Sequence, residues 1–323
     1  MPLSAPIRFR CVLMSLCLTL ACAWPIVANA QGAIEGLTVR PGEGRSLIKI
    51  AVPPFEITGA GFDKPIISEI ITYDLILSGF FTGPDNPQFA KETQRLDLST
   101  GSIHFAEWHR IGVAYLVKGT YEIKNNDIQP IVKIYDPRTQ NYVTGRKYTG
   151  YSTDEVRELA HAISNDIIER LTLQMGVADT RISFVRAIDP YGKTKQICVM
   201  DADGQRERAL TGQGELAATP CWGANGTEIY YTTYRDFNPD LEGFILRTNA
   251  RWWVSRRNGF NLSPAWNDAK KQIALNLTKD GNSEIYTINR EGKEARRLTI
   301  NRAIDSSPSW SPDGTKIAFT SDR

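Results

Sequence analysis

Few residues of this 323-residue chain have the types and spacing that catalysis requires. The three histidines are His104, His109 and His161, and no Gly-x-Ser-x-Gly, His-Glu-x-x-His, P-loop or Gly-x-Gly-x-x-Gly motif occurs. A Ser/His/Asp triad can assemble from distant positions, so the sequence leaves one open. No motif for a nucleophile turn points to such a triad, and we expect the histidines to pack or to face solvent.

Metal and cofactor chemistry are not indicated either. Two cysteines, Cys198 and Cys221, follow the leader described below, and two thiols are too few for a disulfide framework. A bridge between them stays open, because the sequence does not supply its geometry. The acidic clusters at residues 201–203 and 236–240 are expected to form turns between strands. We therefore predict no catalytic residue, no metal ligand and no cofactor, and a function based on surfaces.

The first 30 residues have the three parts of a secretory signal. Two arginines precede an apolar stretch at residues 11–20, and a small-x-small pattern follows at residues 28–30. We predict export with cleavage between Ala30 and Gln31; a lipidation-like pattern ending at Cys22 is the weaker alternative. The apolar stretch is too short to span a bilayer, and no later stretch is long enough, so no membrane span is expected after cleavage.

The charge of the mature chain argues against one class of partner. The leader contains two of the 38 basic residues and none of the 36 acidic ones, so the remaining charges balance. Proteins that bind nucleic acid or anionic lipid usually carry an excess of basic residues. Nucleic acid is therefore not expected as a partner.

A repeat of 44 residues divides the second half of the chain. Each unit begins with a Pro-x-Trp tripeptide and continues with a turn, such as that at Asp313 and Gly314, and with short alternating strands. Four strands in a unit of this length are typical of a blade of a β-propeller. We expect the aromatic residue that starts each unit to pack between blades. These residues are Trp222, Trp266 and Trp310.

The segment before the repeats predicts a mixed domain of helices and strands. Apolar residues recur at helical spacing in some parts and alternate in others. A capping box at Ser152 marks the start of the final helix, which we expect to end near Gly176. The other predicted elements are a strand at 46–52, a helix at 65–77, and paired strands at 111–123 and 128–135 joined by a turn at 124–127.

This order of parts resembles the TolB family. The motifs that carry the resemblance are Val52-Pro-Pro-Phe, Tyr115-Leu-Val-Lys-Gly-Thr-Tyr, Val199-Met-Asp-Ala-Asp-Gly, Phe260-Asn-Leu-Ser-Pro-Ala-Trp and Asp280-Gly-Asn-Ser-Glu-Ile-Tyr. The resemblance implies an α+β N-terminal domain followed by an all-β propeller. That propeller has six blades in the family, and about three are expected here, so we expect a truncated chain. The expected parts are a signal peptide (1–30), an extended arm (31–45), the α/β domain (46–178) and an incomplete propeller (179–323).

The resemblance further implies a periplasmic, non-enzymatic scaffold of the Tol-Pal system. Such a scaffold would link the outer-membrane lipoprotein Pal to the inner-membrane protein TolA and would support envelope integrity and constriction during cell division. Bacteriocins could use the same surfaces.

Two surfaces are candidates for these partners. The loops that enter the innermost strands would form a polar rim for the Pal-like partner, although the same residues could be simple turn formers. The rim residues are Phe260, Asn261, Ser263, Asp305 and Ser306. The arm could add a strand to the sheet of the TolA-like partner through Ile34, Leu37, Val39 and Arg40, unless it is a disordered leader.

Two other functions stay open at this point. The chain could be an exported propeller hydrolase or peptidase whose catalytic domain lies beyond residue 323. It could also be a propeller that binds a sugar or metabolite, which would need polar groups converging on the channel.

Overall fold

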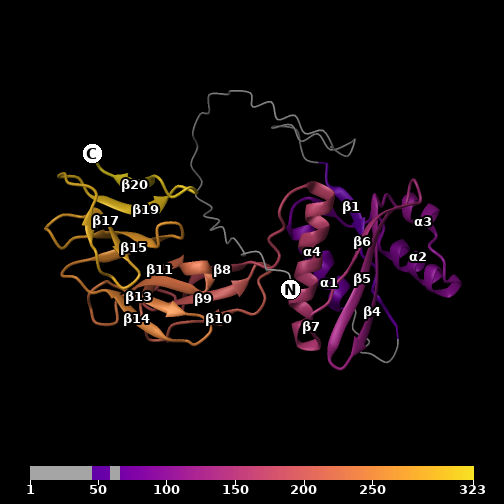
Figure 1. The fold of residues 1–323 in the computed structure, drawn as a ribbon, viewed down its shortest axis with the longest axis horizontal. Helices are drawn as coiled ribbons and strands as arrows, with labels where there is room; N and C mark the ends of the chain where they lie inside the picture. Colours follow the sequence, from indigo (N-terminus) through magenta and orange to yellow (C-terminus); the bar gives the residue numbers. More distant parts are fainter. Residues whose placement is uncertain (1–45, 59–65) are drawn as a thin grey trace. The chain divides into compact units, whose positions relative to one another are not determined.

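A computed structural model describes residues 46–58 and 66–323 (Figure 1). The chain divides into two compact units, with the division between Asp179 and Thr180, and each unit is described here by itself. The predicted signal peptide and arm lie outside the described residues. Within the described ranges, no helix is long and apolar enough to cross a membrane.

The N-terminal domain is built on one mixed sheet whose main strand order is β3-β1-β4-β5-β6. β1 runs parallel to both of its neighbours, whereas β4, β5 and β6 form an antiparallel meander. The short strands β2 and β7 pair with β4 and β5. The strands are β1 (Ile48–Ala51), β2 (Glu56–Ile57), β3 (Phe81–Thr82), β4 (Tyr115–Lys124), β5 (Asp127–Asp136), β6 (Asn141–Lys147) and β7 (Tyr151–Ser152).

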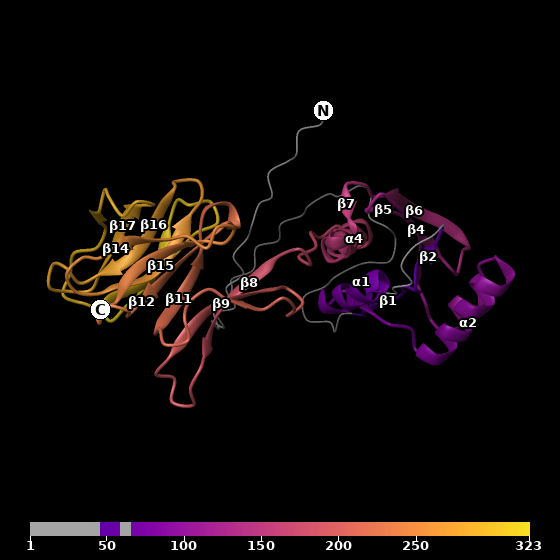
Figure 2. The ribbon, with the colours of Figure 1, turned by 90° about the horizontal axis from the view of Figure 1, so that it is seen from below.

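Helices cover both faces of this sheet (Figures 1 and 2). α1 (Ile66–Leu77) and α4 (Val156–Thr172) lie side by side on one face and bury Ile71 and Ile163 against alternate residues of β4 and β5. α2 (Pro87–Thr100) and α3 (Phe105–Arg110) lie on the other face, where Trp108 is buried in a smaller cluster. Helices on both faces remove the apolar side chains of the sheet from water.

One buried carboxylate, that of Asp97, holds α2, α3 and β4 together. It accepts hydrogen bonds from the backbone N–H of His104 (2.8 Å) and from Trp108 Nε1 (3.0 Å), and it forms an ion pair with Lys118 (3.1 Å). Burial disfavours its charged form, but these partners outweigh burial and lower the pKa of Asp97 below its ordinary value.

Most predicted elements of this domain are confirmed. α1, the hairpin turn at Asn125 and Asn126, and the capping box at Ser152, which opens the short helix η1 (Thr153–Glu155), lie where expected. The last helix ends at Thr172 rather than near Gly176. Leu173 adopts a left-handed conformation (φ 57°) and its N–H bonds to the carbonyl of Glu169, which caps the helix four residues early.

The second unit consists of four sheets in sequence order, drawn in orange to yellow in Figure 1. The second and third sheets have the four antiparallel strands that the repeat predicts, and the first and fourth have three and two within the described residues. The first sheet has β8 (Arg181–Ala187), β9 (Lys195–Asp201) and β10 (Arg208–Ala209). The second has β11 (Ala217–Trp222), β12 (Glu228–Thr233), β13 (Asp240–Ile245) and β14 (Arg251–Ser255). The third has β15 (Asn261–Asn267), β16 (Gln272–Leu277), β17 (Glu284–Asn289) and β18 (Arg296–Arg297), and the fourth has β19 (Asp305–Trp310) and β20 (Ile317–Ser321).

The repeated tryptophans pack between successive sheets, as predicted. Trp266 of the third sheet lies 5.6 Å from the Tyr230 ring of the second, and Trp310 Nε1 donates to the carbonyl of Ala265 (3.0 Å). Cys198 and Cys221 are not joined by a disulfide; the Cys221 sulfur instead accepts the backbone N–H of Trp266 (3.3 Å).

Each first strand of the second, third and fourth sheets contains a bulge at the same repeat position. The bulged residues Thr219, Ser263 and Ser307 all have positive φ, between 50° and 53°, and each precedes a proline. A proline has no backbone N–H to donate to the ladder, so prolines in sheets occur mainly at edges, at strand starts and at bulges. The bulge bends the strand just after it enters the sheet.

Candidate partner-binding end of the repeat sheets

The antiparallel ladders bring one set of loops to a single end of the four sheets, which we call the entry end because β11, β15 and β19 begin there. Backbone hydrogen bonds join these loops across sheets: the N–H of Asn261 bonds to the carbonyl of Pro239, and that of Asp305 bonds to the carbonyl of Ser283 (both 2.9 Å). The entry end comprises loops 188–194, 210–216, 234–239, 256–260, 278–283 and 298–304. The other set of turns forms the opposite end.

A buried amide organises the entry end of the second and third sheets. The Asn261 side chain accepts a hydrogen bond from Ser255 Oγ (2.6 Å) and donates from Nδ2 to the carbonyl of Arg257 (2.9 Å) and toward Asp240 Oδ1 (3.2 Å). It is fully buried, and so are its polar partners Ser255 and Asp240. Buried polar groups stabilise a fold only when they are paired, and here every side-chain atom of the amide has a partner.

Two buried carboxylates, those of Glu284 and Asp305, organise the entry end of the third and fourth sheets. Glu284 accepts from Thr299 Oγ1 (2.5 Å), from the N–H of Asn301 (3.0 Å) and from Arg297 (2.9 Å), and Asn301 Nδ2 in turn donates to Asp305 (2.7 Å). Burial alone would raise the pKa of Glu284 and that of Asp305. The hydrogen bonds and the nearby arginines outweigh this, and both pKa values lie below their ordinary range.

Exposed apolar side chains gather at this end. Phe237 is 99% exposed, Tyr191 84% and Ile300 79%. Phe260 and Ile304 occupy equivalent positions in consecutive repeats, directly before the buried Asn261 and Asp305, and both are more than half exposed. Exposed apolar residues concentrated on one side of a protein are typical of an interaction surface.

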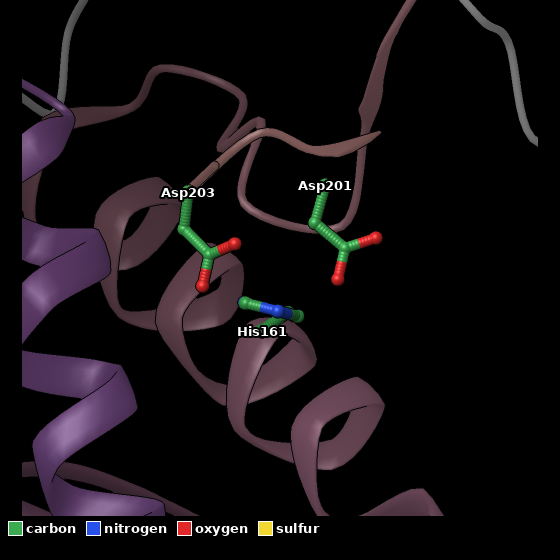
Figure 3. Close-up of side chains that lie close together, drawn as sticks. All are labelled: His161, Asp201 and Asp203. Carbon is green, nitrogen blue, oxygen red and sulfur yellow. The ribbon is translucent and has the colours of Figure 1, made fainter. Parts of the chain in front are cut away.

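The opposite end is polar. Some of its turns are closed by local hydrogen bonds, and Arg290, in the turn after β17, pairs with the buried Glu228 of the sheet before it. None of its described turns exposes a large hydrophobic residue. Figure 3 shows Asp201, the last residue of β9, and Asp203 in the turn that follows. Asp203 accepts the N–H of Gln205 (3.0 Å), and Asp201 pairs with Arg206 (2.6 Å). The prediction that this acidic cluster forms a turn is therefore confirmed.

The structure separates the five predicted rim residues into two kinds. All five lie at the entry end, at the start of β15 or β19. Asn261 and Asp305 are fully buried, so their side chains hold the loops in place rather than facing a partner, and Ser263 contributes the bulge. Phe260 is exposed and Ser306 partly so. That any of them contacts a partner stays a prediction.

Sequence reasoning missed Phe237, Tyr191 and Ile300. Each lies in a loop, where no periodicity distinguishes an exposed apolar side chain from a buried one. The signal that could have found Phe237 is its setting: an aromatic residue inside Asp-Phe-Asn-Pro cannot easily reach the core from so short a turn.

A buried cluster of catalytic residue types lies between α1 and α4 of the N-terminal domain. His161 on α4 (Figure 3) has Nδ1 2.8 Å from Asp74 Oδ2, and Ser164 Oγ donates to the same oxygen (2.8 Å). In a nucleophilic triad the serine is held by the imidazole, which is held by the carboxylate. Here serine and imidazole both bond to the carboxylate, so this cluster does not provide an activated nucleophile. It instead joins α1 to α4.

Two family models match the chain, and together they span most of its length. The model described as "TolB amino-terminal domain" matches residues 41–141, and the model described as "TolB beta propeller domain" matches residues 168–323. The chain belongs to the TolB family. The predicted resemblance and fold class are thereby confirmed: an N-terminal TolB domain is followed by a propeller domain that is only partly present in these residues.

Curated TolB relatives match over most of the chain. A "Protein TolB homolog" of Chlorobium chlorochromatii (strain CaD3) is 29% identical over 97% of this chain. The "Tol-Pal system protein TolB" of Desulfosudis oleivorans is 28% identical over 78% of it. The chain spans 69% of the length of the first relative and 57% of the second.

A solved TolB structure shares the fold. The crystal structure of TolB from Acinetobacter baumannii superposes with a TM-score of 0.73 and 24% sequence identity, covering 86% of this chain and 66% of the other. The chain thus has the fold of a known TolB structure.

Proposed function

We propose that this TolB-family protein is a non-enzymatic scaffold of the Tol-Pal system in the periplasm. It would bind a Pal-like outer-membrane lipoprotein through the entry end of its propeller and a TolA-like inner-membrane protein through the arm at residues 31–45. By joining the two envelope layers it would support envelope integrity and outer-membrane constriction during division.

One observation supports the entry end as the Pal-like site. Its apolar side chains stay exposed although polar side chains beneath them, such as Asn261 and Glu284, are buried and paired, and the opposite end has no such exposed apolar residues in the described turns. A rigid surface with apolar centres and satisfied polar neighbours loses little entropy when it binds another protein. Membership of the TolB family and the name of the Desulfosudis relative support the Tol-Pal assignment.

The proposal is tested with the full-length protein immobilised as bait for the purified periplasmic domains of the Pal-like and TolA-like proteins of the same organism. We expect the unchanged protein to retain both. Deletion of residues 31–44 should remove only the TolA-like domain. A double substitution, Phe260→Ser with Ile304→Ser, should weaken only the Pal-like domain.

A matched control is Lys293→Ser with Glu294→Ser, which changes two exposed residues at the opposite end. It should leave both partners bound. If the unchanged protein retains neither partner, the Tol-Pal assignment is wrong. If the control weakens the Pal-like domain as much as the entry-end variant does, the site lies elsewhere on the propeller.

A further inference from the structure

The loop at residues 234–239, between β12 and β13, presents Phe237 in an unusual way. Its side chain is 99% exposed, so the ring packs on nothing within the described residues. Its φ is 64°, in the left-handed region that bulky residues avoid. Glycine or asparagine would adopt this conformation at lower cost, and exposure of the ring to water adds no stability. Folding therefore gives no reason for a phenylalanine here.

The residues just before Phe237 are fixed by charge pairs. Arg235 pairs with the buried Glu242 (2.9 Å), and its guanidinium lies 4.6 Å from the centre of the Trp253 ring. Asp236 pairs with Arg256 (2.8 Å), whose guanidinium lies 4.5 Å from the same ring on β14. The indole thus contacts two arginines, and the carboxylates neutralise both. The first half of the loop is held to the second sheet.

The residues after Phe237 are fixed as firmly. Asn238 Nδ2 donates to the buried Asp240 (2.6 Å), and the carbonyl of Pro239 accepts the N–H of Asn261 from the third sheet (2.9 Å). Phe237 itself donates its N–H to the carbonyl of Tyr234 (3.0 Å), which closes the turn. Strained conformations persist only when their surroundings determine them this completely, and they are common at functional sites.

We propose that Phe237 is the principal apolar anchor of the entry end and inserts into an apolar pocket on the folded protein partner proposed above, so that this inference depends on that function. A buried phenyl ring contributes strongly to binding, and here the loop has lost its freedom before the encounter. The neighbouring charges are paired with one another, so the partner's pocket is apolar rather than charged. Phe260 and Ile304 extend the same apolar surface.

The test compares the affinity of full-length variants for the periplasmic domain of the Pal-like lipoprotein by titration calorimetry. Phe237→Gly should weaken binding roughly 30-fold or more. The same change should leave the melting temperature equal or raise it, because glycine accepts the left-handed backbone. Phe237→Leu, which keeps an apolar side chain, should lose less affinity than glycine does. Tyr142→Ala, an exposed aromatic residue on β6 of the N-terminal domain, is the matched control and should bind like the unchanged protein.

The outcomes separate the two proposals. If the unchanged protein does not bind the lipoprotein domain, the proposed function is wrong, and this anchor is wrong with it. If the unchanged protein binds and Phe237→Gly stays within about twofold of it, only the anchor is wrong. If Phe237→Gly lowers the melting temperature, Phe237→Asn decides, because asparagine also tolerates positive φ; a folded Phe237→Asn variant that binds within about twofold overturns the anchor.

Discussion

The entry end and the opposite end of the repeat sheets are formed by the same strands, yet they hold polar and apolar groups in different ways. At the entry end, side chains such as Asn261 and Glu284 are fully buried and join loops that are distant in sequence. At the opposite end, the buried Glu228 also pairs with Arg290 of the next sheet, but a turn such as that at Asp313 is held by its own neighbours, with Asp313 accepting the N–H of Thr315 (3.0 Å). Shared buried networks fix several loops at once, whereas local caps fix one turn each. A surface for recognition is better supported by the first arrangement.

The comparison between the two ends predicts its largest effect on stability for Glu284. Replacement by alanine removes the buried carboxylate that pairs with Arg297 and accepts the N–H of Asn301, and it should lower the free energy of unfolding by roughly 3 kcal/mol. Urea denaturation of the full-length protein measures this. Glu291→Ala at the opposite end is the control, because Glu291 is exposed and reaches Arg290 only at 3.7 Å, so its loss should cost less than about 0.5 kcal/mol.

The lowered pKa values of the buried carboxylates Glu284 and Asp305 predict a pH dependence of stability. The folded-state pKa values of Glu284 and Asp305 are lowered, so their contribution to stability is full above the unfolded-state pKa values and is lost as the pH falls toward the folded-state ones. The free energy of unfolding of the unchanged protein should therefore fall with acidification, and that of Glu284→Ala should fall less. Equal slopes for the two proteins would contradict the buried network.

A smaller effect is expected at Asn261. Its replacement by alanine removes the partner of Ser255 Oγ and of the N–H of Arg257, which should cost roughly 2 kcal/mol in the free energy of unfolding. Because the amide positions Phe260, affinity for the Pal-like partner should fall as well. The control is Asn249→Gly: Asn249 is an exposed residue of the opposite end whose side chain bonds to Arg208, and glycine accepts its left-handed backbone (φ 57°). If Asn261→Ala changes neither the free energy of unfolding nor the affinity for the Pal-like partner, the proposed difference between the two ends is wrong.

The smallest expected effect concerns a feature that the two ends share, an aspartate whose pKa is lowered by hydrogen bonds from nearby residues. The pKa of Asp189, in an entry-end loop, is lowered to about 2 by the N–H and hydroxyl of Thr194. The pKa of Asp313, at the opposite end, is lowered to about 2 by the hydroxyl of Ser311 and by the N–H and hydroxyl of Thr315. Titration by NMR should show both carboxylates ionising near this value. Thr194→Val and Thr315→Val should each raise the pKa of their own aspartate only, and a rise at the other end would contradict local capping.

The sequence predicted those elements whose signals are local or strictly periodic. α1 has apolar residues at helical spacing, and the 44-residue repeat places β11, β15 and β19. α2 was missed although Asn86, Pro87 and Gly101 mark its ends, because few apolar residues between them show a helical period. The edge strand β6 was missed because its side chains are mostly exposed and polar, so that alternation is absent.

The candidate site could be predicted only in part. The loops before β15 and β19 were located by the repeat, but the burial of Asn261 and Asp305 depends on groups tens of residues away, such as Pro239 and Ser283. A polar residue in a loop looks the same in sequence whether it faces water or a buried partner. The strain at Phe237 was likewise invisible, because it arises from contacts on both sides of the loop.

The hydrogen bonds that cross between sheets have a consequence for dynamics. The N–H groups of Asn261 and Asp305 each belong to the first strand of one sheet but bond to a carbonyl of the sheet before it. Their exchange with solvent deuterium therefore requires adjacent sheets to separate at the entry end, whereas amides within a single sheet exchange when that sheet frays. These two amides are natural reporters of how often neighbouring sheets part. A bound partner that bridges the sheets should slow both.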